Sequence, residues 1–215
     1  MYLKRQKVPK NWPIHRKGTK YVVRPNSSIH KGIPILVILR DILKVAQNRK
    51  EVKKALHLKQ ILLNNKVVKD EKNNVLLFDT ITIVPSKKSY KVTLSGKGKF
   101  QIEEIKESEA NRKITKIVDK KTLKGKKTQL NLIDGRNFIS NLKCNVNDSV
   151  LINFKDKKLE KCLPLKEKGK VIIFEGKHSG ERGIINKISS DKKMADLSEK
   201  GKKVNVLIKQ LMVVE

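Results

Sequence analysis

The chain carries far more positive than negative charge, and this imbalance limits what it can fold into. Lys and Arg number 51 against 21 Asp and Glu in 215 residues, a formal charge of +30. Charges of one sign at this density repel one another in a compact monomer. Apolar residues make up only 38% of the chain, below the usual share. We therefore expect several small modules and an anionic partner, nucleic acid first and a membrane surface second.

Three further features narrow the class of protein. No apolar run approaches the roughly 18 residues needed to span a bilayer, and the N-terminus MYLKRQKVPKNWP lacks the apolar stretch of a secretory signal. Cys144 and Cys162 are too few for a disulfide scaffold or a Cys-based zinc site, so we expect ordinary thiols in a reducing, cytoplasmic setting.

The basic and aromatic content predicts the manner of nucleic-acid binding. Aromatic residues are only 4% of the chain, which argues against stacking on single-stranded bases and favours phosphate and shape recognition. Lys outnumbers Arg by 43 to 8. This excess fits phosphate binding by point charges and fits genome-level codon bias equally well.

Residues 1–32 are expected to form a basic arm. The first acidic residue of the chain is Asp41, and the residues before it include ten basic ones and three prolines that disfavour helix. Charge this one-sided, with little apolar periodicity, does not collapse alone. We predict an arm that orders on an anionic partner. The alternative, a disordered solubilising tail, does not explain Trp12.

Residues 33–57 are expected to form two helices. Apolar residues recur at helical spacing within residues 35–46, and Pro34 suits the first turn of that helix. Asn48, with Glu51 three residues later, predicts a capping box at the start of the second helix.

The same module is expected to continue to residue 88 as strands. Asn64 and Asn65 tolerate left-handed backbone and therefore predict the turn of a hairpin. The alternation within residues 79–84 predicts a further strand.

Residues 89–163 are expected to form a central β module, a small barrel or sandwich of short strands. Asp134 and Gly135 predict a hairpin turn between two of these strands. One short helix is predicted near residues 104–111.

Residues 164–215 are expected to form a last β module. Its first part is rich in glycine and predicts a hairpin whose loop presents Lys177, His178, Glu181 and Arg182. Strands are predicted at residues 204–208 and 211–214.

A catalytic site is difficult to assemble from these residues. The four histidines have no spacing that pairs two of them on a helix, and HExxH, GxSxG and GxxxxGK[ST] are absent. Asp134 is the one weak catalytic candidate, and a hairpin turn explains it more economically. We expect no metal and no cofactor.

Taken in order, these segments resemble the small-subunit ribosomal protein family S4e of archaea and eukaryotes, and the resemblance runs end to end. It rests on Leu3-Lys4-Arg5, Pro9-Lys10-Asn11-Trp12, Arg24-Pro25, His30-Lys31, Pro34 to Leu43, Glu51-Val52-Lys53, Lys66-Val67, Asp79-Thr80-Ile81, Lys97-Gly98-Lys99-Phe100, Glu109-Ala110, Val146-Asn147-Asp148 and the glycine-bearing segment from Gly169 to Ile185. The last of these looks like a KOW motif, a hairpin and loop within an SH3-like barrel that contacts RNA.

The resemblance implies an α+β chain of four modules. They are a basic N-terminal arm (1–32), an S4-type RNA-binding module of two helices and a hairpin (33–88), a central small β-barrel-like module (89–163) and a C-terminal KOW/SH3-like β-barrel (164–215). It also implies a structural constituent of the small ribosomal subunit in the cytoplasm. Such a protein binds folded small-subunit rRNA and neighbouring ribosomal proteins, with no catalysis, membrane or small-molecule substrate.

We expect the RNA contacts to come from basic side chains near the recognised motifs, together with Trp12. The expected residues are Lys4, Arg5, Lys7, Lys10, Trp12, Arg16, Lys17, Arg24, His30, Lys31, Arg40, Lys44, Arg49, Lys53, Lys54, Lys66, Lys177, His178 and Arg182.

Three other functions compete with this interpretation. An RNA-modifying enzyme with an S4-type module would need a reaction centred on Asp134. A KOW-type factor that binds RNA polymerase would need more exposed apolar surface. A binder of anionic membranes ranks last, because the sequence lacks an amphipathic helix with aromatic anchors.

Overall fold

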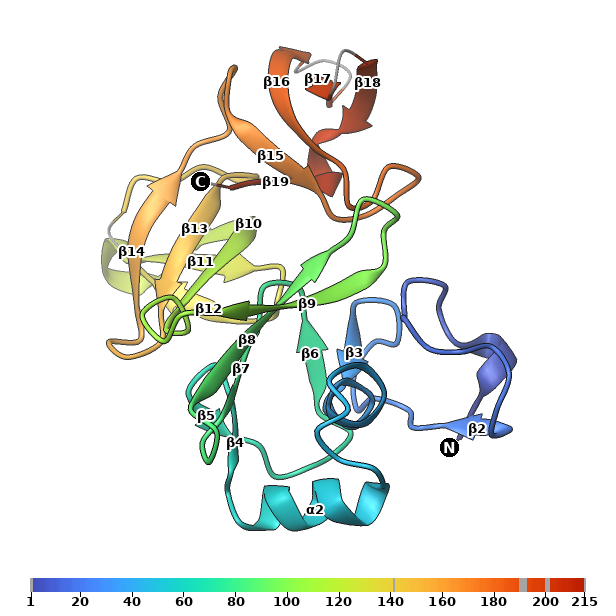
Figure 1. Cartoon of the computed structure of the whole chain (residues 1–215). Helices are drawn as coiled ribbons and strands as arrows, with labels where there is room; N and C mark the ends of the chain where they lie inside the picture. The colour runs from blue at the N-terminus through green and yellow to red at the C-terminus, as the bar shows by residue number, and fades with distance from the viewer. Residues whose placement is uncertain (1, 141, 190–192, 200–201, 215) are drawn as a thin grey trace. The chain divides into compact units, whose positions relative to one another are not determined.

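The computed structural model describes residues 2–140, 142–189, 193–199 and 202–214. The chain forms two compact units, one from residues 1–93 and 99–111, the other from residues 94–98 and 112–215 (Figure 1). Both consist mainly of antiparallel strands, and the helices are few. The predicted α+β class is therefore confirmed, and the strands form several sheets.

The N-terminal segment is folded by contacts within its own unit. Strands β1 (Leu3–Lys4) and β2 (Tyr21–Val22) pair antiparallel, and a 3-10 turn, η1 (Arg5–Lys7), follows β1. Leu3, Trp12 and Val22 are buried, and the Trp12 indole N–H donates to the carbonyl of Gly32 at 3.1 Å. The prediction that this segment needs a partner in order to collapse is wrong, because its few apolar side chains gather on one side of the hairpin.

Arg5 holds the long loop between β1 and β2. Its guanidinium donates to the carbonyls of Thr19 (2.6 Å) and His15 (2.7 Å), and to the Thr19 hydroxyl at 2.8 Å. A positive charge in this acid-free segment therefore stabilises the local fold by binding backbone oxygens.

The two predicted helices are present, and the first is short. β3 (Gly32–Pro34) pairs with β6 (Asn74–Leu76) and leads into α1 (Ile35–Val37), which continues as a π-helical turn, η2 (Ile38–Ile42).

The second helix, α2 (Arg49–His57), begins at the predicted cap. The Asn48 side chain accepts from the Glu51 N–H at 3.1 Å. The Glu51 carboxylate accepts in return from the Gln47 N–H at 2.7 Å, one residue before the usual position.

A five-stranded sheet completes the first unit. Its order is β5 (Lys66–Val67), β4 (Ile61–Leu63), β7 (Thr80–Ile83), β8 (Lys88–Leu94) and β9 (Phe100–Ile105). Asn64 and Asn65 turn the β4–β5 hairpin with φ of 51° and 60°, as predicted. The expected boundary at residue 88 falls inside this sheet, because β8 pairs with β7. The helix predicted near residues 104–111 is instead the end of β9 followed by turns.

The second unit contains two five-stranded antiparallel sheets. The first has the order β12 (Asn137–Ile139), β11 (Thr128–Leu132), β10 (Arg112–Thr122), β13 (Ser149–Asn153) and β14 (Lys158–Leu163). The second has the order β18 (Lys202–Leu207), β17 (Met194–Glu199), β16 (Arg182–Ser189), β15 (Lys170–Ile173) and β19 (Leu211–Val213). Single 3-10 turns, η3 (Lys124–Lys126) and η4 (Ile208–Gln210), precede β11 and β19.

Buried polar contacts join the two sheets of the second unit. The Lys116 amine donates to the carbonyls of Ile208 and, at 2.8 Å, Leu211, and Ser149 Oγ accepts from the Val213 N–H at 2.9 Å. Lys116 is only 2% exposed, and burial lowers its pKa to about 8. The strand β19 is therefore tied to both sheets.

Two loops of the second unit approach backbone to backbone. A Cβ added to Gly180, in the β15–β16 loop, would stand 1.9 Å from the carbonyl oxygen of Ser95. Gly180 also has a φ of 92°. Only glycine fits this position, because any side chain would meet backbone and not a movable side chain.

We expect Gly180→Ala to lower the free energy of unfolding by about 2 kcal/mol or more, from backbone strain and overpacking together. Gly125→Ala is the matched control, since Gly125 has a φ of 77° but nothing within 4 Å of an added Cβ. Urea midpoints measure both variants. Equal losses in the two would contradict a tight contact between the loops.

We expect Lys116 to make stability rise with pH between about 8 and 10.5. The folded amine has a pKa of about 8 and the ordinary value is 10.5, so the unfolded chain binds more protons in this window. Relative to Lys116→Met, the wild-type chain should gain at most about 3 kcal/mol on going from pH 7.5 to 10.5. Urea titrations at each pH give the difference, and parallel pH profiles would show that the amine is not buried.

Candidate nucleic-acid interface

The structure places most of the expected RNA-contacting residues on the surface. The exposed ones are Lys4, Lys7, Lys10, Arg16, Lys17, His30, Lys31, Lys44, Arg49, Lys53, Lys54, Lys66, Lys177 and Arg182. Arg5, Arg24, Arg40 and His178 are half-buried, and Trp12 is 3% exposed. The structure contradicts the expectation that Trp12 faces RNA, because its indole lies in the core of the first unit and its N–H is already bonded to Gly32.

The N-terminal hairpin and its loop form a basic surface. Lys4, Lys7, Lys10 and Lys17 are exposed, and the sequence places no acidic residue before Asp41. Their charges therefore add, and the surface attracts phosphate over a distance set by the ionic strength.

Helix α2, which Figure 1 shows, carries a second basic surface. Arg49, Lys50, Lys53, Lys54 and His57 are exposed along it, while its apolar side chains are buried. Basic residues in the last turn also suit the negative end of the helix dipole.

Two arginines expected at the interface are engaged within the chain. Arg40 pairs with Asp41 at 2.9 Å, and Arg49 binds the buried carboxylate of Glu71 through Nε at 2.8 Å and through a second nitrogen. Hydrogen bonds to these carboxylates raise the pKa of both guanidinium groups. The Arg49 pair therefore joins α2 to the segment around Glu71, whereas Arg40 pairs only with its neighbour in the chain.

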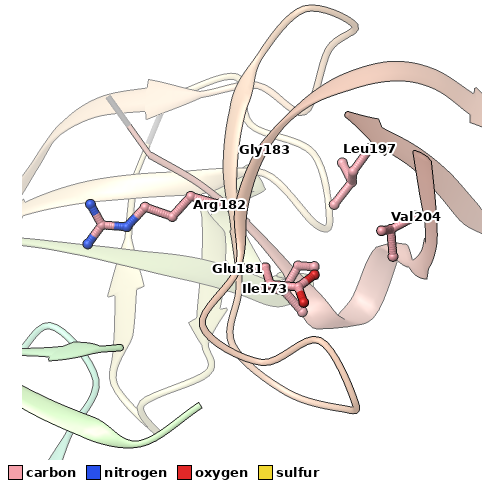
Figure 2. A pocket seen from close by; sticks show the side chains of 6 residues that line it. All are labelled: Ile173, Glu181, Arg182, Gly183, Leu197 and Val204. Atoms are coloured by element: carbon pink, nitrogen blue, oxygen red, sulfur yellow. The ribbon is translucent and has the colours of Figure 1, made fainter. Parts of the chain in front are cut away.

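The loop between β15 and β16 presents the predicted C-terminal residues. Lys177 is exposed, and the His178 ring pairs with Glu181 at 3.0 Å. Figure 2 shows Arg182 directed away from the other residues around a small hollow that opens to solvent. The hollow is lined by Ile173, Glu181, Arg182, Gly183, Leu197 and Val204. The Arg182 guanidinium is therefore directed away from the hollow, and the residue is exposed.

The tip of the β10–β11 hairpin is a further basic surface, which was not predicted from the sequence. Strand β10 extends beyond its pairing with β13 and turns into β11 around Gly125, whose φ is 77°. Lys120, Lys121, Lys124 and Lys127 are exposed there. The signal was present as a dense run of lysines around one glycine within residues 120–127.

Asp134 has a structural position. Its carboxylate is 3% exposed and accepts from the Lys113 amine at 3.0 Å, and Lys113 is itself 2% exposed. The same side chain accepts from the Arg136 N–H at 3.2 Å and so closes the β11–β12 turn. A carboxylate held this way is not placed to activate a substrate.

The two cysteines are free, as expected. Burial, followed by the neighbouring Cys144, raises the pKa of Cys162 to about 12, which opposes formation of a reactive thiolate. Among the described residues no group of His, Cys, Asp and Glu is arranged to hold a metal ion. In the same part of the chain, no helix has the length and apolarity needed to cross a membrane.

Comparisons with known proteins give the family. Residues 86–159 match the family described as Ribosomal family S4e, and residues 2–31 match the RS4NT (NUC023) domain. Small ribosomal subunit protein eS4 of Methanocella arvoryzae is 40% identical over 190 residues, which cover 87% of this chain and 80% of that protein. The eS4 protein of Methanothermobacter thermautotrophicus is 36% identical over 191 residues, covering 87% of this chain and 79% of that protein.

A solved structure shares the fold. The crystal structure of the 30S ribosomal protein S4e from Thermoplasma acidophilum matches with a TM-score of 0.74 at 24% identity, covering 86% of this chain and 95% of that one. The proteins similar in sequence bear the names of ribosomal structural proteins, and the catalytic alternative based on Asp134 has no support in its geometry. The chain belongs to ribosomal family S4e, the non-enzymatic family of the small ribosomal subunit protein eS4.

Proposed function

We propose that this chain binds folded small-subunit rRNA, through phosphate and shape contacts, as a structural part of the small ribosomal subunit. One observation carries the proposal. Each of the two units carries many exposed lysines, whereas Asp41, Glu71 and Asp134 are engaged in ion pairs within the chain. The remaining surface is strongly positive, which suits a polyanion whose shape spans many phosphates.

The S4e membership supports a modular form of this binding. The two helices and the β4–β5 hairpin within residues 33–88 would act as an S4-type RNA-binding module. The five strands from β15 to β19, within residues 164–215, would form a KOW module in an SH3-like barrel, with Lys177 and Arg182 on its RNA side. The N-terminal hairpin would add phosphate contacts of its own.

The proposal also names the surroundings of the chain. Its partners would be rRNA and neighbouring ribosomal proteins, and its location the ribosome in the cytoplasm. The lysines of the β10–β11 tip, exposed beyond the part of β10 that pairs with β13, join the proposed contact set. Trp12 leaves it because the indole is buried.

We expect the affinity for small-subunit rRNA to fall steeply with salt, by about 10³- to 10⁵-fold between 50 and 200 mM for some 6–10 phosphate contacts. Replacing Lys4, Lys7, Lys10 and Lys17 by Ala should flatten the plot of log affinity against log salt by about 0.7 to 0.9 per lost contact. Filter binding across a salt series measures both slopes. Point substitutions are preferable to deleting residues 1–32, because the deletion would also remove Leu3 and Trp12 from the core.

The matched control removes the same number of charges elsewhere. Lys155, Lys157, Lys158 and Lys166 are also exposed and lie outside the proposed contact set. Their replacement by Ala should change the slope less. An equal change in both sets would mean that net charge alone drives binding, with no defined interface.

We expect the endogenous chain to sediment with small ribosomal subunits in a sucrose gradient, and to remain there through a moderate salt wash. Sedimentation near the top of the gradient would contradict the proposal. Sedimentation with RNA polymerase would favour the competing KOW-type factor.

A further inference from the structure

The N-terminal hairpin exposes an aromatic pair that the fold does not need. In the β1–β2 register Leu3 faces Val22 and Lys4 faces Tyr21. Side chains alternate between the faces of a strand, so Leu3 and Val22 point into the core, 5% and 9% exposed. Tyr21 points outward beside Tyr2, and these two rings are 46% and 69% exposed.

The two rings are held in a defined arrangement. Their centroids lie 5.0 Å apart, and their planes meet at 72° in an edge-to-face contact. Such a contact uses the edge of one ring, which leaves both faces of that ring uncovered by its partner. The Lys20 amine lies 5.6 Å from the centroid of Tyr21. A cation therefore lies over one face of Tyr21, next to the more exposed ring of Tyr2.

The pair is unusual for this chain. Only 4% of the residues are aromatic, and two of the three tyrosines are in this pair. Among the large hydrophobic side chains that the structure describes as exposed, Tyr2 and Tyr21 are the aromatic ones, and the others are aliphatic. Low aromatic content argued against base stacking over the whole surface, but it does not argue against stacking at one place.

The charges around the Tyr2–Tyr21 pair indicate which kind of ligand it binds. Lys4, Lys7, Lys17 and Lys20 are exposed near or within the hairpin, and no acidic residue precedes Asp41. A nucleotide offers the two matching groups, a flat base for the ring and a phosphate for the amines. An apolar protein surface would match the rings but would leave the lysines without counter-charges.

We propose that Tyr2 and Tyr21 form a stacking site for one unpaired RNA base, with Lys4 and Lys20 binding the adjoining phosphates. This inference rests on the proposed rRNA binding and adds a ligand class to it. A base within a continuous duplex already has both faces covered by its neighbours. The site therefore selects a bulge, loop or strand end.

The test measures the affinity of the full chain for two probes, a short oligouridylate and a fully paired RNA duplex with the same number of phosphates. The double variant Tyr2→Ala/Tyr21→Ala should bind oligouridylate about 5- to 150-fold more weakly, the range for loss of one stacked base, and should bind the duplex as the wild-type chain does. Tyr2→Phe/Tyr21→Phe should retain both affinities. Tyr2→Leu/Tyr21→Leu should behave like the alanine variant.

Two controls separate stacking from charge and from misfolding. Lys20→Ala removes a cation and should weaken both probes by a similar factor. The emission of buried Trp12 reports whether the hairpin is intact. Tyr2→Ala alone, at a residue before β1 begins, gives the same test if the double variant does not fold.

The possible outcomes are distinct. Unchanged oligouridylate binding by the alanine variants, equal losses on both probes, or full retention by the leucine variant would each overturn the stacking site. An alanine variant that binds both RNAs normally but leaves the small subunit in a gradient would assign the pair to a neighbouring protein, and would also overturn it. If the wild-type chain binds neither probe, the proposed rRNA binding itself is contradicted.

Discussion

Electrostatic self-repulsion is the constraint on which this architecture depends. A chain with a formal charge of +30 cannot gather its surface around one large core without crowding like charges. The second unit instead closes two small apolar clusters. One is centred on Val171, Ile173 and Ile185 and the other on Ile117, Leu130 and Val150. Buried polar contacts at Lys116 and Ser149 then join the sheets, so cohesion between them relies on directional bonds as well as on apolar area.

The basic residues divide into two roles. Several of the few arginines bind oxygen atoms or a ring within the chain: Arg5 at backbone carbonyls, Arg49 at Glu71, Arg112 at Glu160, and Arg136 over Phe154. The planar guanidinium suits such fixed, multidentate geometry. Most lysines remain exposed on flexible stems, where they supply positive potential over a broad area. The shortage of arginine is thus compatible with its use as a structural residue.

The sequence predicted the features that depend on neighbours along the chain. The Asn48–Glu51 cap, the Asn64–Asn65 turn, the Asp134–Gly135 turn and the β15–β16 hairpin all arise from residues a few positions apart. Each follows from turn or capping chemistry alone.

The features that the sequence did not predict depend on distant partners. Trp12 donates to the backbone of Gly32, Arg5 donates to Thr19, and Arg49 pairs with Glu71. No local sequence pattern predicts these contacts. Strand β17, Met194–Glu199, was missed because its residues are mostly polar or small and its order comes from pairing with β16 and β18. For the candidate site, exposure of the lysines followed from charge, whereas the internal partners of Arg5 and Arg49 required the fold. The exposed Tyr2–Tyr21 pair required the β1–β2 register.

The folded N-terminal segment has a consequence for the order of events during synthesis. Its residues leave the ribosome before the partners that hold them, because its contacts include Asn26 with Asp70, Asn74 with Ser27, and the Phe100 N–H with the carbonyl of Asn11. Chains emerge at about 5–20 residues per second, so this segment spends several seconds without the residues that fix it. Its final structure therefore forms only after a long stretch of later chain has been made.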